Sequence, residues 1–272
     1  MKKTVKEITR IYNSVAEFSA ALSGPYNTKI FEKRCSETLP ESFTGTPNLE
    51  TANKLLEYGD AGSLEKIQAV RVRNNAGNGA EIRRRQVNSV VGYTPNVPNY
   101  LRGIPVSMIG QTRQRFQSSK VINIVYGAGA AYNIGPEQIA SESSKLLSVI
   151  NSIEKAGYRV GLSILYSRTN QDRSEREACI IKIKDAGQYM DVRKLAYILV
   201  NPSFQRRHLF RFTETVTEFS DPRWQDHYGY HVDKEYNKDL INRTPALKGS
   251  KYIGFYNLMN KTAEDVEKIL LS

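Results

Sequence analysis

The most constraining feature of this sequence is a strand–helix–strand pattern in the middle of the chain. An apolar run with a single asparagine, residues 121–125, meets a turn that contains Gly127 and Gly129. An amphipathic segment, residues 136–156, follows this turn and leads into a second apolar run at residues 158–166. This order predicts a β-α-β unit, and the turn after its first strand is where α/β folds bind ligands.

The segments that follow extend this unit to an α/β domain, expected over residues 119–272. Its predicted architecture is an open, mainly parallel sheet with flanking helices. Further strands are expected at residues 178–183, with Lys182 and Lys184 facing outward, and at residues 252–258. Helices are expected at residues 190–200, 204–219 and 262–271, with a polar, turn-rich stretch at residues 220–244.

Residues 1–118 predict an irregular, mostly helical region before this domain. A short helix is expected over residues 14–22, because Ser14 and Glu17 have the spacing of a capping box. Pro47 indicates the start of another helix, which Gly59 ends. Residues 87–101 contain one glycine and two prolines among apolar residues, which predicts an ordered, extended loop.

The positive charge of the chain is concentrated in one segment. The formal net charge is +11 over 272 residues, and residues 71–120 alone hold nine cations against one acid, Glu81. Eight of the nine are arginines, which bind phosphates through two nitrogens at once. Tyr93, Tyr100 and Phe116 lie between them as stacking surfaces, so the segment predicts nucleic-acid binding, with a solvated or ion-paired face as the alternative. The cations are Arg71, Arg73, Arg83, Arg84, Arg85, Arg102, Arg113, Arg115 and Lys120.

A second basic cluster lies in the helix expected at residues 204–219. Arg207 and Arg211 are four residues apart and therefore share one side of a helix, and Arg206 lies beside them. We expect these three arginines to extend the nucleic-acid-binding surface. His208 has no nucleophile or metal ligand at a useful spacing, so no catalytic residue is assigned.

The turn at Gly127 and Gly129 has two interpretations. Backbone N–H groups of a glycine turn before a helix can bind an anion such as phosphate. A dinucleotide fingerprint, however, requires a third glycine where Tyr132 stands, and no acid ends the second strand. The alternative is that the glycines permit tight packing under a loop.

Neither a metal site nor a disulfide is expected. His227 and His231 have the spacing of a helical ligand pair, but the residues between them, Tyr228-Gly229-Tyr230, disfavour a helix. Cys35 and Cys179 are far apart and have no histidine or second cysteine at metal-ligand spacing, which favours two free thiols. We therefore expect no metal and no cofactor.

Residues 121–272 resemble the von Willebrand factor A family. The resemblance lies in the order of strand, loop and helix, and in the sequence Gly-Tyr-Arg-Val at residues 157–160. In that family the first loop reads D-x-S-x-S and binds a divalent metal through its side chains. The matching positions here are Tyr126, Ala128 and Ala130, so the resemblance implies the fold without the metal site.

The chain also resembles a family of uncharacterised proteins from bacteriophages and prophages. This resemblance rests on residues 43–46, on the sequence Val-Gly-Tyr-Thr-Pro-Asn-Val-Pro-Asn-Tyr-Leu-Arg-Gly-Ile-Pro at residues 91–105, and on Arg206-Arg207-His208. It implies a phage origin and no established activity.

Together these features predict a non-catalytic phage protein that binds nucleic acid or a nucleoprotein assembly through residues 71–120. The alternatives are a virion or assembly protein whose basic face meets DNA or an acidic partner, and an enzyme that holds phosphate at the Gly127–Gly129 turn. No apolar run approaches the roughly 20 residues that cross a bilayer, and the N-terminus lacks a signal peptide. The expected location is the cytoplasm of the bacterial host, or the virion, with no membrane partner.

Overall fold

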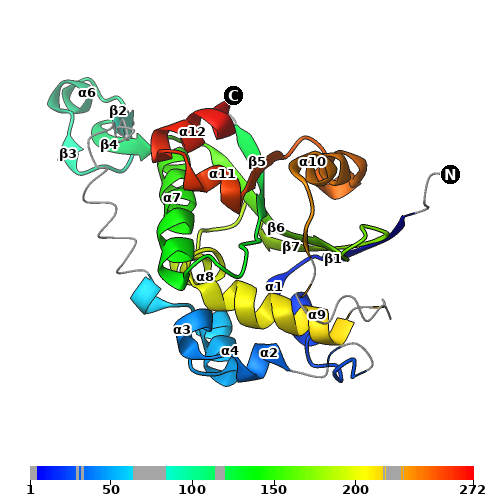
Figure 1. Cartoon of the computed structure of the whole chain (residues 1–272). Helices are drawn as coiled ribbons and strands as arrows, with labels where there is room; N and C mark the ends of the chain where they lie inside the picture. The colour runs from blue at the N-terminus through cyan, green and yellow to red at the C-terminus, as the bar shows by residue number, and fades with distance from the viewer. Residues whose placement is uncertain are drawn as a thin grey trace.

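The computed structural model describes residues 5–28, 31, 34–63, 84–113, 120–216, 218, 228 and 230–272. Its main body is an α/β fold around a mainly parallel sheet of five strands in the order β1-β7-β6-β5-β9 (Figure 1). Along this order only β6 and β7 run antiparallel. The strands are β1 (Lys6–Tyr12), β5 (Val121–Gly127), β6 (Arg159–Thr169), β7 (Glu175–Lys184) and β9 (Lys251–Gly254), with a short strand β8 (Tyr230–His231) paired to the end of β6.

The predicted β-α-β unit is confirmed. β5 and β6 pair in parallel from Val121 opposite Arg159 to the end of β5, and α7 (Pro136–Lys155) connects them. Pro136 lies in the first turn of α7, where a residue without an N–H loses no helix hydrogen bond. The apolar residues of α7 recur at helical spacing and are buried against the sheet.

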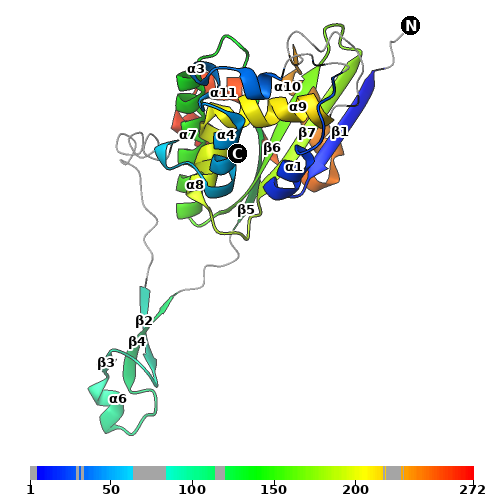
Figure 2. The same ribbon diagram turned by 90° about the horizontal axis from the view of Figure 1, so that it is seen from below.

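Helices cover both faces of the main sheet (Figures 1 and 2). The larger hydrophobic core packs α7 and most other helices on one face, whereas α10 (Lys234–Arg243) packs Tyr236, Leu240 and Ile241 against the other. Among the helices that the structure describes, none is long and apolar enough to cross a bilayer. The other described helices of the main body are α1 (Val15–Ala21), α2 (Cys35–Thr38), α3 (Glu41–Thr44), α4 (Leu49–Tyr58), α8 (Val192–Leu195), η1 (Ala196–Val200), η2 (Phe204–Leu209), α9 (Phe210–Val216), η4 (Pro245–Leu247), α11 (Phe255–Met259) and α12 (Ala263–Leu271).

The N-terminal residues belong to this main body, so the predicted division at residue 118 does not separate two packed halves. β1, which the sequence did not predict, pairs in parallel with β7 from Lys6 opposite Glu175. The residues of α1 and α4 pack into the same core as the main sheet. α1 begins as predicted, because the Ser14 hydroxyl accepts a hydrogen bond from the Glu17 backbone N–H.

Three predictions for the main body differ from the structure. The polar stretch at residues 220–244 contains α10, whose few apolar residues all face the sheet. The expected strand at residues 252–258 is strand only as far as Gly254, after which α11 begins. Lys184 does not face outward: its ammonium is buried and donates to Glu154 Oε1 (2.7 Å) and to the Val160 carbonyl (2.8 Å).

Residues 84–113 form a second, three-stranded antiparallel sheet instead of the extended loop predicted at residues 87–101. Figure 2 shows it apart from the main sheet. Gly92 is required where the chain crosses onto β4, because a Cβ there would lie 2.3 Å from the Ile109 carbonyl oxygen. We call this unit the small sheet; it has the strand order β2-β4-β3 and consists of β2 (Arg84–Ser89), β3 (Thr94–Pro95), α6 (Val97–Leu101) and β4 (Met108–Arg113).

Candidate nucleic-acid interface

The small sheet brings together cations that are far apart in the sequence. Arg84 on β2 and Arg113 on β4 are direct register partners, and Arg85 follows Arg84 along β2. Like charges directly opposite each other destabilise an antiparallel pair of strands because they repel one another. A bound anion would remove that repulsion. With Arg102, residues 84–113 contain four arginines and no acidic residue.

The small sheet also exposes an unusual amount of apolar and aromatic surface. Tyr93 is 57% exposed and Tyr100 is 71% exposed, and Val91 and Leu101 lie open to solvent beside them. Among residues 86–110, whose side-chain exposure is described, Gly110 alone is buried. Exposed apolar surface of this kind is typical of an interaction site.

Two other cations of the predicted segment, Arg102 and Lys120, are among the described residues. Arg102 is exposed directly after α6, and Lys120 is exposed directly before β5. Arg71, Arg73, Arg83 and Arg115, together with Phe116, lie outside the described residues.

The second predicted basic cluster lies inside the protein, and its assignment to the surface is wrong for Arg206 and Arg207. Both are in η2 and are at most 1% exposed. Arg206 donates to the Phe43 carbonyl (2.7 Å), and its guanidinium lies over the Phe43 ring at 3.8 Å from the centroid. Neither residue can reach a nucleic acid while the protein is folded.

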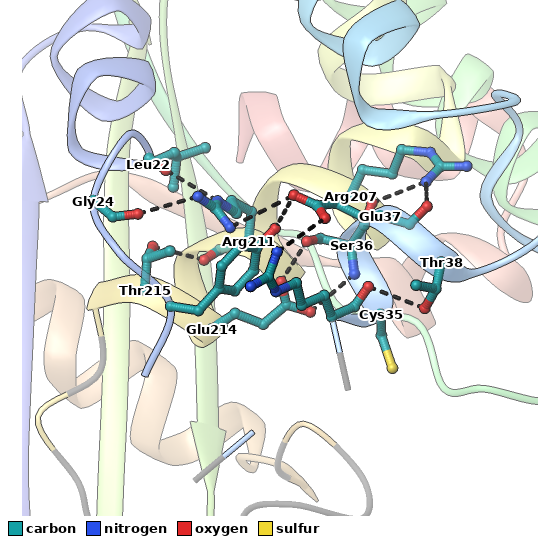
Figure 3. Close-up of polar contacts among 12 residues, drawn as sticks. Leu22, Gly24, Cys35, Ser36, Glu37, Thr38, Arg207, Arg211, Glu214 and Thr215 are labelled. Carbon is teal, nitrogen blue, oxygen red and sulfur yellow. Dashed lines mark hydrogen bonds and ion pairs between the residues drawn. The ribbon is translucent and has the colours of Figure 1, made fainter. Parts of the chain in front are cut away.

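Arg207 forms hydrogen bonds with several polar groups of the N-terminal segment at once (Figure 3). Its nitrogens donate to the carbonyl oxygens of Ser36 (2.9 Å) and Leu39 (3.2 Å) and to the hydroxyl oxygens of Thr44 and Thr46 (2.8 Å each). Residues 36–46 consist mainly of the one-turn helices α2 and α3. The last C=O groups of a helix have no partner within it, so this one side chain satisfies acceptors that these short helices leave unpaired.

Arg211 has the same structural role one turn later. It is half-buried, and it donates to the carbonyl oxygens of Leu22 (3.0 Å) and Gly24 (3.1 Å) while its guanidinium lies over the Tyr26 ring at 3.6 Å. These contacts engage Arg211 with the protein itself, so they give no support to its predicted place on a nucleic-acid surface.

The carboxyl group of Glu214 completes this buried region. It accepts hydrogen bonds from the Ser36 backbone N–H (2.9 Å), from the Ser36 hydroxyl and from the Tyr228 hydroxyl (2.6 Å). Burial raises the pKa of Glu214, and the residue is fully covered. The carboxyl is thus placed to anchor α2 to α9 and has no access to a substrate.

His208 is equally enclosed. Its Nδ1 lies 3.0 Å from the Tyr197 hydroxyl and its Nε2 lies 3.0 Å from Asn53 Oδ1. Burial, together with the nearby Arg207 charge, lowers the pKa of His208 to about 3. The ring is therefore neutral at physiological pH, and both of its nitrogens have protein partners.

This buried imidazole predicts a loss of stability in mild acid. Between pH 6.5 and pH 3 the unfolded chain takes up a proton on His208 that the folded chain does not, so the free energy of unfolding falls as the pH falls. Two pH units below the unfolded pKa this amounts to about 2 to 3 kcal/mol. Urea unfolding at neutral pH and near pH 4.5 measures it.

The variant His208→Gln isolates this contribution. The Glu214 carboxyl, whose pKa is raised, acts in the opposite direction, since it stabilises the folded state as the pH falls. The Glu214 effect is the same in the wild-type protein and in His208→Gln. A smaller pH dependence of the free energy of unfolding in His208→Gln therefore reports on His208 alone. Equal pH dependence in the two proteins would contradict the assignment.

The turn at Gly127 and Gly129 borders a cleft of about 220 Å³ at the carboxyl ends of β5 and β9. Gly127 is explained by packing, because a Cβ there would lie 2.6 Å from the Tyr252 hydroxyl oxygen. Two backbone N–H groups near the turn are already used: Ala128 donates to the Leu165 carbonyl (2.9 Å) and Ala131 to the Tyr256 hydroxyl (2.8 Å). The geometry of this turn agrees better with tight packing than with phosphate binding.

The positions compared with the metal-binding loop have structural roles. Tyr126 is buried with its hydroxyl 3.0 Å from Ser143 Oγ, and Ala128 is buried in the core. Ala130 packs against the same core. Across the described part of the chain, no three His, Cys, Asp or Glu side chains group as a metal site would require. His227 lies outside the described residues; Cys35 and Cys179 are both free thiols.

One comparison with known proteins places the chain in a family. A family model described as a domain of unknown function, DUF7192, matches residues 2–269. The chain belongs to this family. No curated protein and no solved structure matches it. The DUF7192 match spans the small sheet as well as the main body, so both are parts of the domain that defines the family.

Proposed function

We propose that this DUF7192 protein binds nucleic acid, or a nucleoprotein assembly, through the arginine-rich segment at residues 71–120, without catalysing a reaction. The observation that supports this best is the small sheet, where Arg84 lies opposite Arg113 in a unit with four arginines and no acid. Phosphate contacts by arginine supply most of the affinity of sequence-independent nucleic-acid binding.

The chemistry of the main body supports a binding role over a catalytic one. Its titratable groups with a shifted pKa include His208 and Glu214, and both are buried with partners that hold the N-terminal segment in place. Perturbed pKa values mark active sites only when the groups line an accessible cleft, and structural networks perturb them too. A virion or assembly role, in which the basic segment meets packaged DNA, agrees with the same surface.

The proposal includes a phage origin and a von Willebrand factor A-like fold, because the sequence resembles both families. A phage origin places the protein in the cytoplasm of a bacterial host or in the virion. A von Willebrand factor A-like arrangement is supported by the order of β5, α7 and β6, with Tyr126, Ala128 and Ala130 at the positions where that family holds metal.

A binding assay with a charge-deleted variant tests the proposal. Replacing Arg83, Arg84 and Arg85 together with alanine should weaken binding to unrelated DNA and RNA sequences by similar factors, because phosphate contacts carry no sequence information. Fluorescence anisotropy with labelled oligonucleotides at low ionic strength measures this.

Two matched variants serve as controls. Replacing the exposed Lys155, Lys238 and Lys248 of the main body with alanine removes the same charge and should leave the affinity nearly unchanged. Replacing the three arginines with lysine keeps the charge and should retain most of the binding. An equal loss in the Lys155, Lys238 and Lys248 variant would show that net charge, and not this segment, determines binding.

A further inference from the structure

One face of the small sheet combines positive charge with polar groups. Side chains alternate between the two faces of a strand, and register partners share a face. Arg84, Gln86 and Asn88 of β2 therefore lie on the same face as their β4 partners, which include Arg113 opposite Arg84. We call this the arginine face of the small sheet.

An exposed tyrosine and the start of α6 are tied to the arginine face by hydrogen bonds. Gln86 Nε2 donates to the Tyr93 hydroxyl (3.0 Å), and Asn96 Nδ2 donates to Asn88 Oδ1 (3.0 Å). Asn96 also caps α6, because its Oδ1 accepts from the Asn99 backbone N–H. The hydroxyl of Tyr93 is thus fixed while more than half of the side chain stays open to solvent, and α6 carries the second exposed ring, Tyr100.

We propose that the arginine face binds single-stranded nucleic acid, with unpaired bases stacking on Tyr93 and Tyr100 while Arg84 and Arg113 contact phosphates. Base faces are accessible in a single strand and hidden in a duplex, so exposed rings on the same small unit as the arginines favour a single strand. Arg84 and Arg113 are two of the four arginines of a unit that has no acidic residue, and this charge complements a polyanion. This inference rests on the proposed function and specifies the form of nucleic acid that is bound.

Binding to single strands with and without bases tests the proposal in the full-length protein. The probes are labelled oligothymidylate, oligouridylate, an abasic strand and a duplex, all of the same length. We expect both base-containing single strands to bind more tightly than the duplex. The variant Tyr93→Leu/Tyr100→Leu should weaken their binding about tenfold or more per ring and leave the abasic strand unaffected.

Two further variants separate stacking from misfolding. Tyr93→Phe/Tyr100→Phe keeps both rings and should retain the affinity even though the Gln86 hydrogen bond is lost. Tyr58→Leu/Tyr189→Leu removes two tyrosine rings of the main body that are also largely exposed, and should have no effect. A loss of binding in the phenylalanine variant as large as in the leucine variant would contradict stacking.

The outcomes distinguish this inference from the proposed function. Equal binding of duplex and single strand, unchanged by the leucine variant, overturns the single-strand assignment and leaves phosphate binding by the segment intact. Failure of every probe to bind overturns both and points to a protein partner for the exposed rings.

Discussion

Replacing Arg207 with methionine is expected to leave the chain without a stable fold. The guanidinium donates to the backbone of Ser36 and Leu39 and to the hydroxyls of Thr44 and Thr46 in a fully buried position. Methionine preserves the apolar stem but removes the donor from several buried or partly buried acceptors, at up to about 1 to 3 kcal/mol each. The sum approaches the total stability of an ordinary domain, about 5 to 15 kcal/mol.

Denaturant unfolding followed by circular dichroism measures this effect, and Arg193→Met is its matched control. Arg193 is exposed on α8, so its replacement should change the free energy of unfolding by less than about 0.5 kcal/mol. Arg207→Lys should fall between the two, because one ammonium cannot reach all of these acceptors. Unfolding of Arg207→Met at the same denaturant concentration as Arg193→Met would contradict the structural role of Arg207.

The second large effect is expected at the ion pair between Arg168 and Glu177, which joins neighbouring strands β6 and β7. Both side chains are at most 2% exposed, and Arg168 Nε lies 2.8 Å from Glu177 Oε2. Replacing Arg168 with methionine should lower the free energy of unfolding by about 3 to 5 kcal/mol, because the Glu177 carboxylate is left buried without its partner. Thermal and urea unfolding measure the loss.

A double variant separates the cost of the unpaired charge from the value of the pair. Arg168→Met/Glu177→Leu removes both charges and should recover most of the stability that the single variant loses. Lys182→Met provides the exposed counterpart, since Lys182 and Asp185 form an ion pair in solvent whose loss costs at most about 1 kcal/mol. A double variant as unstable as Arg168→Met would show that the loss came from packing.

The parts of the fold that the sequence predicted are those whose signals are local. Ser14 and Glu17 are three residues apart, and their hydrogen bond forms at the start of α1 as their spacing indicates. The apolar period of α7 and the runs on either side of it likewise identified β5 and β6. β1 was missed because its partner, β7, lies about 170 residues away and its own residues are mostly polar.

The candidate site shows the same limit. Sequence reasoning found the cation-rich segment, but only the register of β2 and β4 reveals that Arg84 lies opposite Arg113. It misplaced Arg206 and Arg207, because charge is a property of the residue whereas burial depends on which segments pack over it. The apolar neighbours Phe204, Leu209 and Phe212, all buried, were the available signal that this stretch is internal.

The salt dependence of nucleic-acid binding tests the central claim most directly. If the segment at residues 71–120 contacts phosphates, the logarithm of the association constant should fall linearly with the logarithm of salt concentration. The slope should be about −0.9 per neutralised phosphate on duplex DNA and about −0.7 on single strands. Replacing Arg83, Arg84 and Arg85 with alanine should flatten the duplex slope by up to about three units. A wild-type protein that binds neither single- nor double-stranded DNA or RNA at low salt would contradict the claim.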